Sequence, residues 1–90
     1  MKKVVNKVSF NLSTERKKFE FIVPNRFLYI LSCPGDFYIS VNDKDDDMIN
    51  LKNISFIDLS GASKLYITNP SSSGTVELLF TSLLKIEFTP

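Results

Sequence analysis

Residues 63–80, SKLYITNPSSSGTVELLF, carry the pattern that decides the fold class. Apolar and polar residues alternate on both sides of a central loop, with apolar side chains at Leu65, Ile67, Val76, Leu78 and Phe80. Because side chains of a β-strand point to its two faces in turn, each run can bury one face and expose the other. The loop at residues 69–74 combines Pro, Gly and three Ser, which favour turns. The pattern predicts two strands joined as a β-hairpin.

The same alternation recurs along the rest of the chain. It predicts strands at residues 4–12, 17–23, 27–31, 37–41 and 84–88, and one or two short strands within residues 48–59. In residues 17–23, the core-facing positions are expected to be Phe19, Phe21 and Val23. About eight short strands with turn signals every ~8–12 residues are typical of a sandwich or barrel. We therefore expect one all-β domain over residues 1–90, an antiparallel β-sandwich of jelly-roll type.

Length, charge and composition exclude several classes of protein. Ninety residues support a single core, and the net charge of +1 provides no global positive field for a nucleic-acid partner. No run reaches the ~20 apolar residues of a membrane span, and none follows Met1 as a secretory leader would. One cysteine, Cys33, forbids an internal disulfide. We expect a soluble protein, made inside a cell, with neither nucleic acid nor membrane as partner.

Residues for catalysis are scarce. The chain has no His, so the usual Ser or Cys triad and the commonest general base are both absent. Cys33 precedes a Pro-Gly turn, where a packed thiol is expected rather than a nucleophile. We expect no enzyme activity, no catalytic residue and no cofactor.

An acidic loop follows residue 42. Its carboxylates alternate like the opening of a calcium loop, at Asp43, Asp45 and Asp47. The EF-hand template requires Gly at its sixth position and Glu at its twelfth, which here are Met48 and Ile54. We expect no metal site and a solvated loop, with a looser cation site using Asp36 or Asp46 as the alternative.

Several strands are apolar on both faces, although a two-sheet sandwich needs only one apolar face per strand. The surplus predicts a contact surface between copies of the chain, at Ile22, Phe27, Tyr29, Leu31, Leu79 and Leu83. The alternative is that residues 48–59 fold over this surface within one chain. We expect a homo-oligomer.

Two tyrosines suggest a different function. Tyr38 and Tyr66 fall opposite the core-facing positions of their strands, as the aromatic rings of a carbohydrate-binding sandwich would. The alternative is that they fill half-buried outer positions with their hydroxyls in water.

Three segments also carry a resemblance to a known class of protein. These are FYISV at residues 37–41, LYITNP at 65–70 and GTVEL at 74–78. Over residues 19–80 the chain resembles the small jelly-roll or β-sandwich virion proteins of tailed bacteriophages, of head-decoration, head-fibre or tail-accessory type. The resemblance implies a structural role in the virion, synthesis in the host cytoplasm, other virion proteins as partners and a trimer or other ring. It supplies no catalytic residue, and the histidines of a cupin metal centre are missing.

Overall fold

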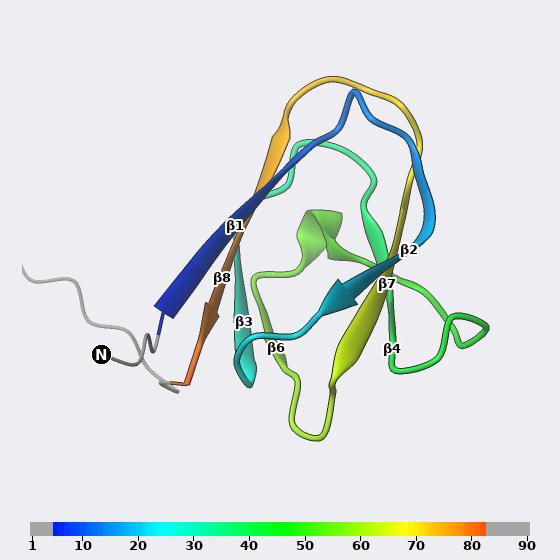
Figure 1. Cartoon of the computed structure of the whole chain (residues 1–90). Coiled ribbons are helices and arrows are strands. Elements are labelled where there is room, and N and C mark those ends of the chain that lie inside the picture. Colours follow the sequence, from blue (N-terminus) through cyan, green and yellow to red (C-terminus); the bar gives the residue numbers. More distant parts are fainter. Residues whose placement is uncertain (1–4, 83–90) are drawn as a thin grey trace, which may run out of the picture.

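The computed structural model describes residues 5–82, which form two four-stranded antiparallel sheets packed face to face (Figure 1). Sheet A has the order β1 (Val5–Asn11), β8 (Thr75–Thr81), β3 (Phe27–Ser32), β6 (Phe56–Asp58). Sheet B has the order β2 (Arg16–Ile22), β7 (Lys64–Asn69), β4 (Tyr38–Val41), β5 (Ile49–Asn50). One 3₁₀ turn, η1 (Leu51–Asn53), lies between β5 and β6 in the chain. The predicted all-β sandwich of about eight strands is confirmed, whereas the strand expected at 84–88 lies outside the described residues.

The strand order is that of a jelly roll. β1 pairs with β8, β2 with β7, β3 with β6 and β4 with β5, so the first half of the described chain pairs with the second half. The outermost pair, Val5–Thr81, and the innermost, Ile39–Ile49, are nearly symmetric about the acidic loop. The described chain is thus one long antiparallel ribbon, folded back at this loop and wound into two sheets.

Hydrogen bonds continue along this ribbon where it turns from one sheet to the other. At the first corner, at the top of Figure 1, Leu12 N donates to Gly74 O (3.0 Å) and Ser72 N donates to Leu12 O (2.9 Å). At the second corner Val23 N donates to Ser63 O (2.9 Å). At both corners, backbone N–H and C=O groups are therefore hydrogen-bonded within the chain, whereas in a simple loop they would be bonded to water.

The predicted hairpin of residues 63–80 is wrong. β7 lies in sheet B and β8 in sheet A, and residues 70–74 cross between the sheets instead of reversing within one. Leu65 and Ile67 face Val76, Leu78 and Phe80 across the interior, and all five side chains are buried. Alternation records which face of a strand is buried but not which strand lies beside it, so both arrangements fit the same sequence.

Phenylalanines from both sheets fill the core. The ring of Phe10 contacts the ring of Phe21 edge-on (5.7 Å between centroids) and the ring of Phe37 (5.4 Å), and Phe21 contacts Phe80 (5.5 Å). Such contacts add to the stabilisation that burial of the ring area provides. Phe19, predicted to be buried, is about half exposed, because β2 is an edge strand whose register shifts between Arg16 and Phe19.

The inward polar position of β1 has a partner. Asn6 lies opposite Phe80, on the core side, and its side-chain amide donates to the Asn25 side chain. Asn6 is partly buried, and this hydrogen bond satisfies its amide on the core side of the strand. No helix among residues 5–82 has the length and apolar character needed to cross a membrane.

The first corner yields a stability prediction. Gly74 has φ +107°, and a Cβ added there would lie 2.7 Å from Pro34 Cγ. Gly74→Ala should lower the free energy of unfolding by about 3 kcal/mol, because backbone strain and a steric clash add. Gly61→Ala is the matched control: φ is +81° but no atom lies within 4 Å of the added Cβ, so about 1 kcal/mol is expected. Urea unfolding measures both, and equal losses would contradict the role assigned to Pro34.

Candidate functional site

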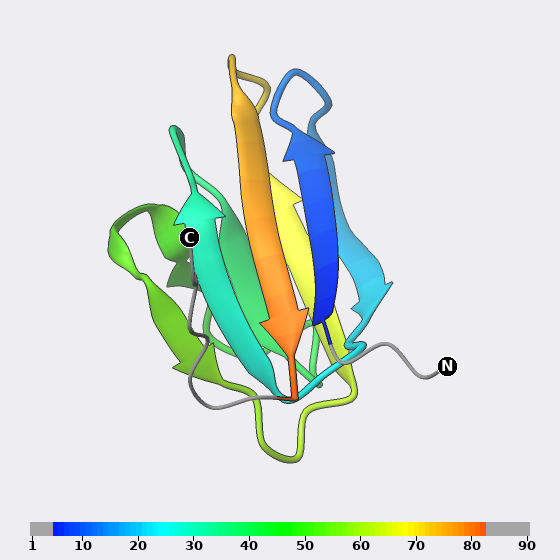
Figure 2. The same cartoon turned by 90° about the vertical axis from the view of Figure 1, so that its left-hand side faces the viewer.

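The outer face of sheet A carries a cluster of aromatic and aliphatic side chains. Cross-strand register places Tyr29 of β3 between Leu79 of β8 and Phe56 of β6, on the side away from the core. The ring of Phe56 lies 6.0 Å from that of Phe27, stacked, and 5.0 Å from that of Tyr29. Leu31 follows on the same strand, where the register of β3 against β8 shifts between Ile30 and Ser32, and it is exposed. We call Phe27, Tyr29, Leu31, Phe56 and Leu79 the aromatic face. Figure 2 looks onto this side of the molecule, with β8 (orange) between β1 (blue) and β3 (cyan).

Exposure is uneven across the aromatic face. Leu31 is 49% and Phe56 38% exposed, whereas Phe27 and Leu79 are only 7% and 8% exposed. Residues 48–59 do not fold over this face, which was the alternative to self-association. They supply the edge strands β5 and β6, and Phe56 of β6 enlarges the aromatic face. The sandwich core is already filled from the other side of the same strands, so the aromatic face is a second apolar surface.

Ion pairs flank the aromatic face on two sides. Arg26 makes a bidentate contact with Asp58, with Nε to Oδ1 and Nη2 to Oδ2 both 2.9 Å, and its guanidinium lies 4.8 Å from the centre of the Phe27 ring. The hydrogen bond to Arg26 lowers the pKa of Asp58, and the same contact raises the pKa of Arg26. On the β1 side, Lys7 Nζ lies 3.8 Å from Glu77 Oε1. An apolar centre with a charged rim is the usual layout of a protein contact surface.

Four of the six predicted interface residues come together here: Phe27, Tyr29, Leu31 and Leu79. Ile22 does not, because it lies opposite Lys64 in sheet B, where it is 62% exposed. Leu83 lies outside the described residues. Sequence reasoning missed Phe56, although two adjacent apolar residues, Phe56 and Ile57, signal a strand that is apolar on both faces.

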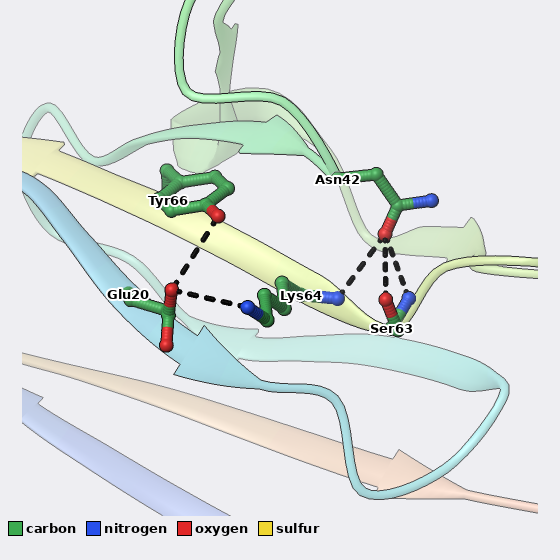
Figure 3. A network of polar contacts seen from close by, with 5 residues as sticks. All are labelled: Glu20, Asn42, Ser63, Lys64 and Tyr66. Atoms are coloured by element: carbon green, nitrogen blue, oxygen red, sulfur yellow. Dashed lines mark hydrogen bonds and ion pairs between the residues drawn. The ribbon is translucent and has the colours of Figure 1, made fainter.

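The outer face of sheet B holds the two predicted tyrosines. Tyr38 lies opposite Thr68, and Ser40 lies opposite Tyr66, so the two tyrosines are diagonal neighbours on adjacent strands. Both are half-buried and Ser40 is buried. The hydroxyl of Tyr66 donates to Glu20 Oε1 (3.4 Å), and Lys64 Nζ lies 3.4 Å from the same oxygen (Figure 3). We call Glu20, Tyr38, Ser40, Lys64, Tyr66 and Thr68 the tyrosine face.

Asn42 fixes one end of the tyrosine face. Its backbone is left-handed (φ 62°), and its Oδ1 accepts hydrogen bonds from Ser63 N (2.7 Å), Ser63 Oγ (3.3 Å) and Lys64 N (3.2 Å) (Figure 3). Its Nδ2 donates to Gly61 O (3.1 Å). One side chain just after β4 therefore holds the start of β7, and with it the position of Lys64.

The acidic loop uses its carboxylates locally. Asp45 pairs with Lys18 (3.0 Å), Asp43 Oδ1 accepts from Asp45 N, and Asp46 Oδ1 accepts from Asp47 N. Asp36 accepts instead from Asn50 Nδ2 (3.1 Å). Within residues 5–82, no group of three or more His, Cys, Asp or Glu is placed to hold a metal ion.

Cys33 is half-buried and its Sγ donates to Gly35 O (3.2 Å). Burial raises the pKa of this thiol, which disfavours the reactive thiolate. No pocket is found in the part of the chain that the structure describes. The described residues thus present two outer sheet surfaces, the apolar aromatic face and the mixed tyrosine face.

Comparison with known proteins adds no assignment: no protein-family model, no curated protein and no solved structure matches the chain.

The contact between Arg26 and Asp58 predicts a pH dependence. The lowered pKa of Asp58 means that its contribution to stability is present above the ordinary value of 3.8 and is lost as the pH falls through the folded-state value. Asp58→Asn should therefore reduce stability at pH 7, and the difference from wild type should shrink as the pH falls below 3.8. Urea unfolding across this range measures it. Glu77→Gln, which removes a carboxylate from the longer contact with Lys7, is the control; a pH-independent loss for Asp58→Asn would contradict the prediction.

Two variants of Asn42 separate its hydrogen bonds from its backbone. Asn42→Gly loses the side-chain bonds but accepts φ 62°, whereas Asn42→Ala loses the same bonds and strains the backbone. Both should be less stable than wild type, and the Ala variant should be lower than the Gly variant by about 1 kcal/mol. Thermal unfolding tests this order, and an Ala variant as stable as the Gly variant would refute it.

Proposed function

We propose that this protein is a non-enzymatic structural or assembly protein that associates with further copies of itself through the aromatic face. The observation that carries the proposal is this second apolar surface, which lies on the outside of a sandwich whose core is complete. Contiguous apolar patches on small proteins usually mark interaction sites. The exposed Leu31 and Phe56 are the side chains that a partner copy would cover.

The size of the face limits the strength of a single contact. The face spans three strands about 4.8 Å apart: β3 and β8 are about 20 Å long and β6, with three residues, about half that, so the face covers roughly 250 Å². A standard interface buries about 800 Å² per partner, so a contact between two copies through this face buries about a third of that area. Such a gain only just offsets the cost of association, which is about 4–15 kcal/mol. The face therefore suits an assembly in which each subunit makes several contacts, such as a closed ring or a repeated lattice.

The setting that we propose is the virion of a tailed bacteriophage, where the chain serves in head decoration or as a tail accessory. What supports this is the resemblance of residues 19–80, together with a jelly-roll strand order and an interface suited to many copies. Other virion proteins are then its partners, and a trimer or other ring is its oligomer. Capsid and tail genes beside the gene for this chain would support this setting, and their absence would count against it.

Light scattering after size exclusion, from 1 to 500 µM protein, tests self-association. The wild-type mass should rise with concentration towards a small integral multiple of 10.2 kDa. Leu31→Glu and Phe56→Glu should each weaken association at least tenfold, because each buries a charge in the contact. Met48→Glu, at an exposed apolar residue outside the aromatic face, should associate like wild type.

Circular dichroism of each variant confirms that its sheet content is retained. A wild-type protein that stays a 10.2 kDa monomer at 500 µM would overturn the proposal. Equal effects of the Glu substitutions at positions 31 and 48 would overturn the assignment of the contact to the aromatic face.

A further inference from the structure

We propose that the tyrosine face binds an uncharged oligosaccharide, with the rings of Tyr38 and Tyr66 as its platform. This site is independent of self-association, because it lies on sheet B and the aromatic face lies on sheet A. The two sites are on opposite outer sides of the sandwich, so copies joined through one keep the other accessible. The proposal therefore adds a ligand to the assembly role and does not depend on it.

The register of β4 and β7 brings the two rings within reach of one ligand. Diagonal neighbours on adjacent antiparallel strands have their backbones about 7–8 Å apart, a distance that aromatic side chains bridge. Ser40, opposite Tyr66, is small and buried, so it places no bulky side chain beside the two rings. No pocket is found here among the described residues, so a ligand would lie on the surface of the sheet, where the C–H face of a pyranose can stack on a tyrosine ring.

Polar groups around the rings match the hydroxyls of a sugar. Glu20 offers carboxylate oxygens that accept, and Lys64 offers an ammonium that donates, both at the edge of the Tyr66 ring (Figure 3). Next to Tyr38, Thr68 carries a hydroxyl that accepts from Lys18 N (3.0 Å) and keeps its own hydrogen to donate. The side-chain amide of Asn50 is already bonded to Phe37 N, Lys52 N and Asp36, so it is not part of the site. Sugar hydroxyls both donate and accept, so they can use acceptors and donors that alternate along a surface.

The charges of this surface favour a neutral ligand. Lys64 is paired with Glu20 (3.4 Å), and Lys18 is paired with Asp45 (3.0 Å). Each cation is therefore already matched by a carboxylate, and a phosphate or sulfate group would meet Glu20 and Asp45 as like charges. A protein partner is less favoured, because Lys and Glu are depleted from the centres of protein contacts.

Asn42 supports the site without touching the ligand surface. By accepting from Ser63 N and Lys64 N it fixes where β7 begins, and hence the spacing between Lys64 and Glu20. We regard Asn42 as a positioning residue.

A glycan array of neutral and anionic oligosaccharides, probed with the full chain, identifies the ligand class. The best neutral oligosaccharide is then titrated by calorimetry into wild type and variants. Tyr38→Ala and Tyr66→Ala should each weaken binding at least tenfold, whereas Tyr66→Phe, which keeps the ring and loses the bond to Glu20, should weaken it less than threefold. Leu31→Glu is the control on the aromatic face and should bind like wild type.

Three outcomes would overturn the proposal: no binding on the array, binding of anionic glycans alone, or undiminished binding by the tyrosine-to-alanine variants. Because Leu31→Glu disrupts self-association and leaves the tyrosine face intact, failure of the assembly proposal and failure of the glycan proposal give different results.

Discussion

The antiparallel ladder that pairs the first half of the described chain with the second is the constraint on which the structure depends. It runs from Val5 opposite Thr81 to Ile39 opposite Ile49, and hydrogen bonds such as Leu12 N to Gly74 O carry it around the corners. Since register fixes the face of every side chain, the ladder decides which residues meet in the core and which meet outside. The two outer surfaces are consequences of the same pairing that builds the interior.

These outer surfaces differ in chemistry. Sheet A presents aromatic and aliphatic side chains, with the ion pair of Arg26 and Asp58 beside them. Sheet B presents tyrosines among side chains of both charges, already paired with one another. A contact with another protein is driven by burial of apolar area, whereas a small polar ligand needs ring faces and hydrogen-bonding groups. The sandwich thus places two chemically different surfaces on opposite sides of its core.

Within the described residues, the sequence was sufficient to predict most strands and most of their buried faces, but not which strands lie side by side. Alternation identified Leu65 and Val76 as core residues, and surplus apolar positions pointed to Phe27, Tyr29, Leu31 and Leu79. It could not place Phe56 beside Tyr29, or Tyr38 beside Tyr66, because these contacts come from pairing between distant segments. The wrong hairpin has the same cause: a loop of turn-favouring residues fits a reversal within one sheet and a crossing between two. Phe19 remains half exposed because β2 lies at an edge, which is a property of the assembled sheet and not of the strand.

The symmetry of the pairing about the acidic loop also bears on how the chain can fold. Thr81 is far from Val5 in sequence, and closing a loop of that length in one step costs more conformational entropy than closing a short one. Pairing the strands in order along the ladder lowers the conformational entropy cost of each closure. β4 and β5 can meet first, because only a short loop separates them, and each later pair then closes only a few more residues on either side. In this way a topology with many contacts between distant residues can form through a series of short loop closures, each one following the pair before it. In this folding route, the acidic loop at residues 42–47 is the turn at which strand pairing begins.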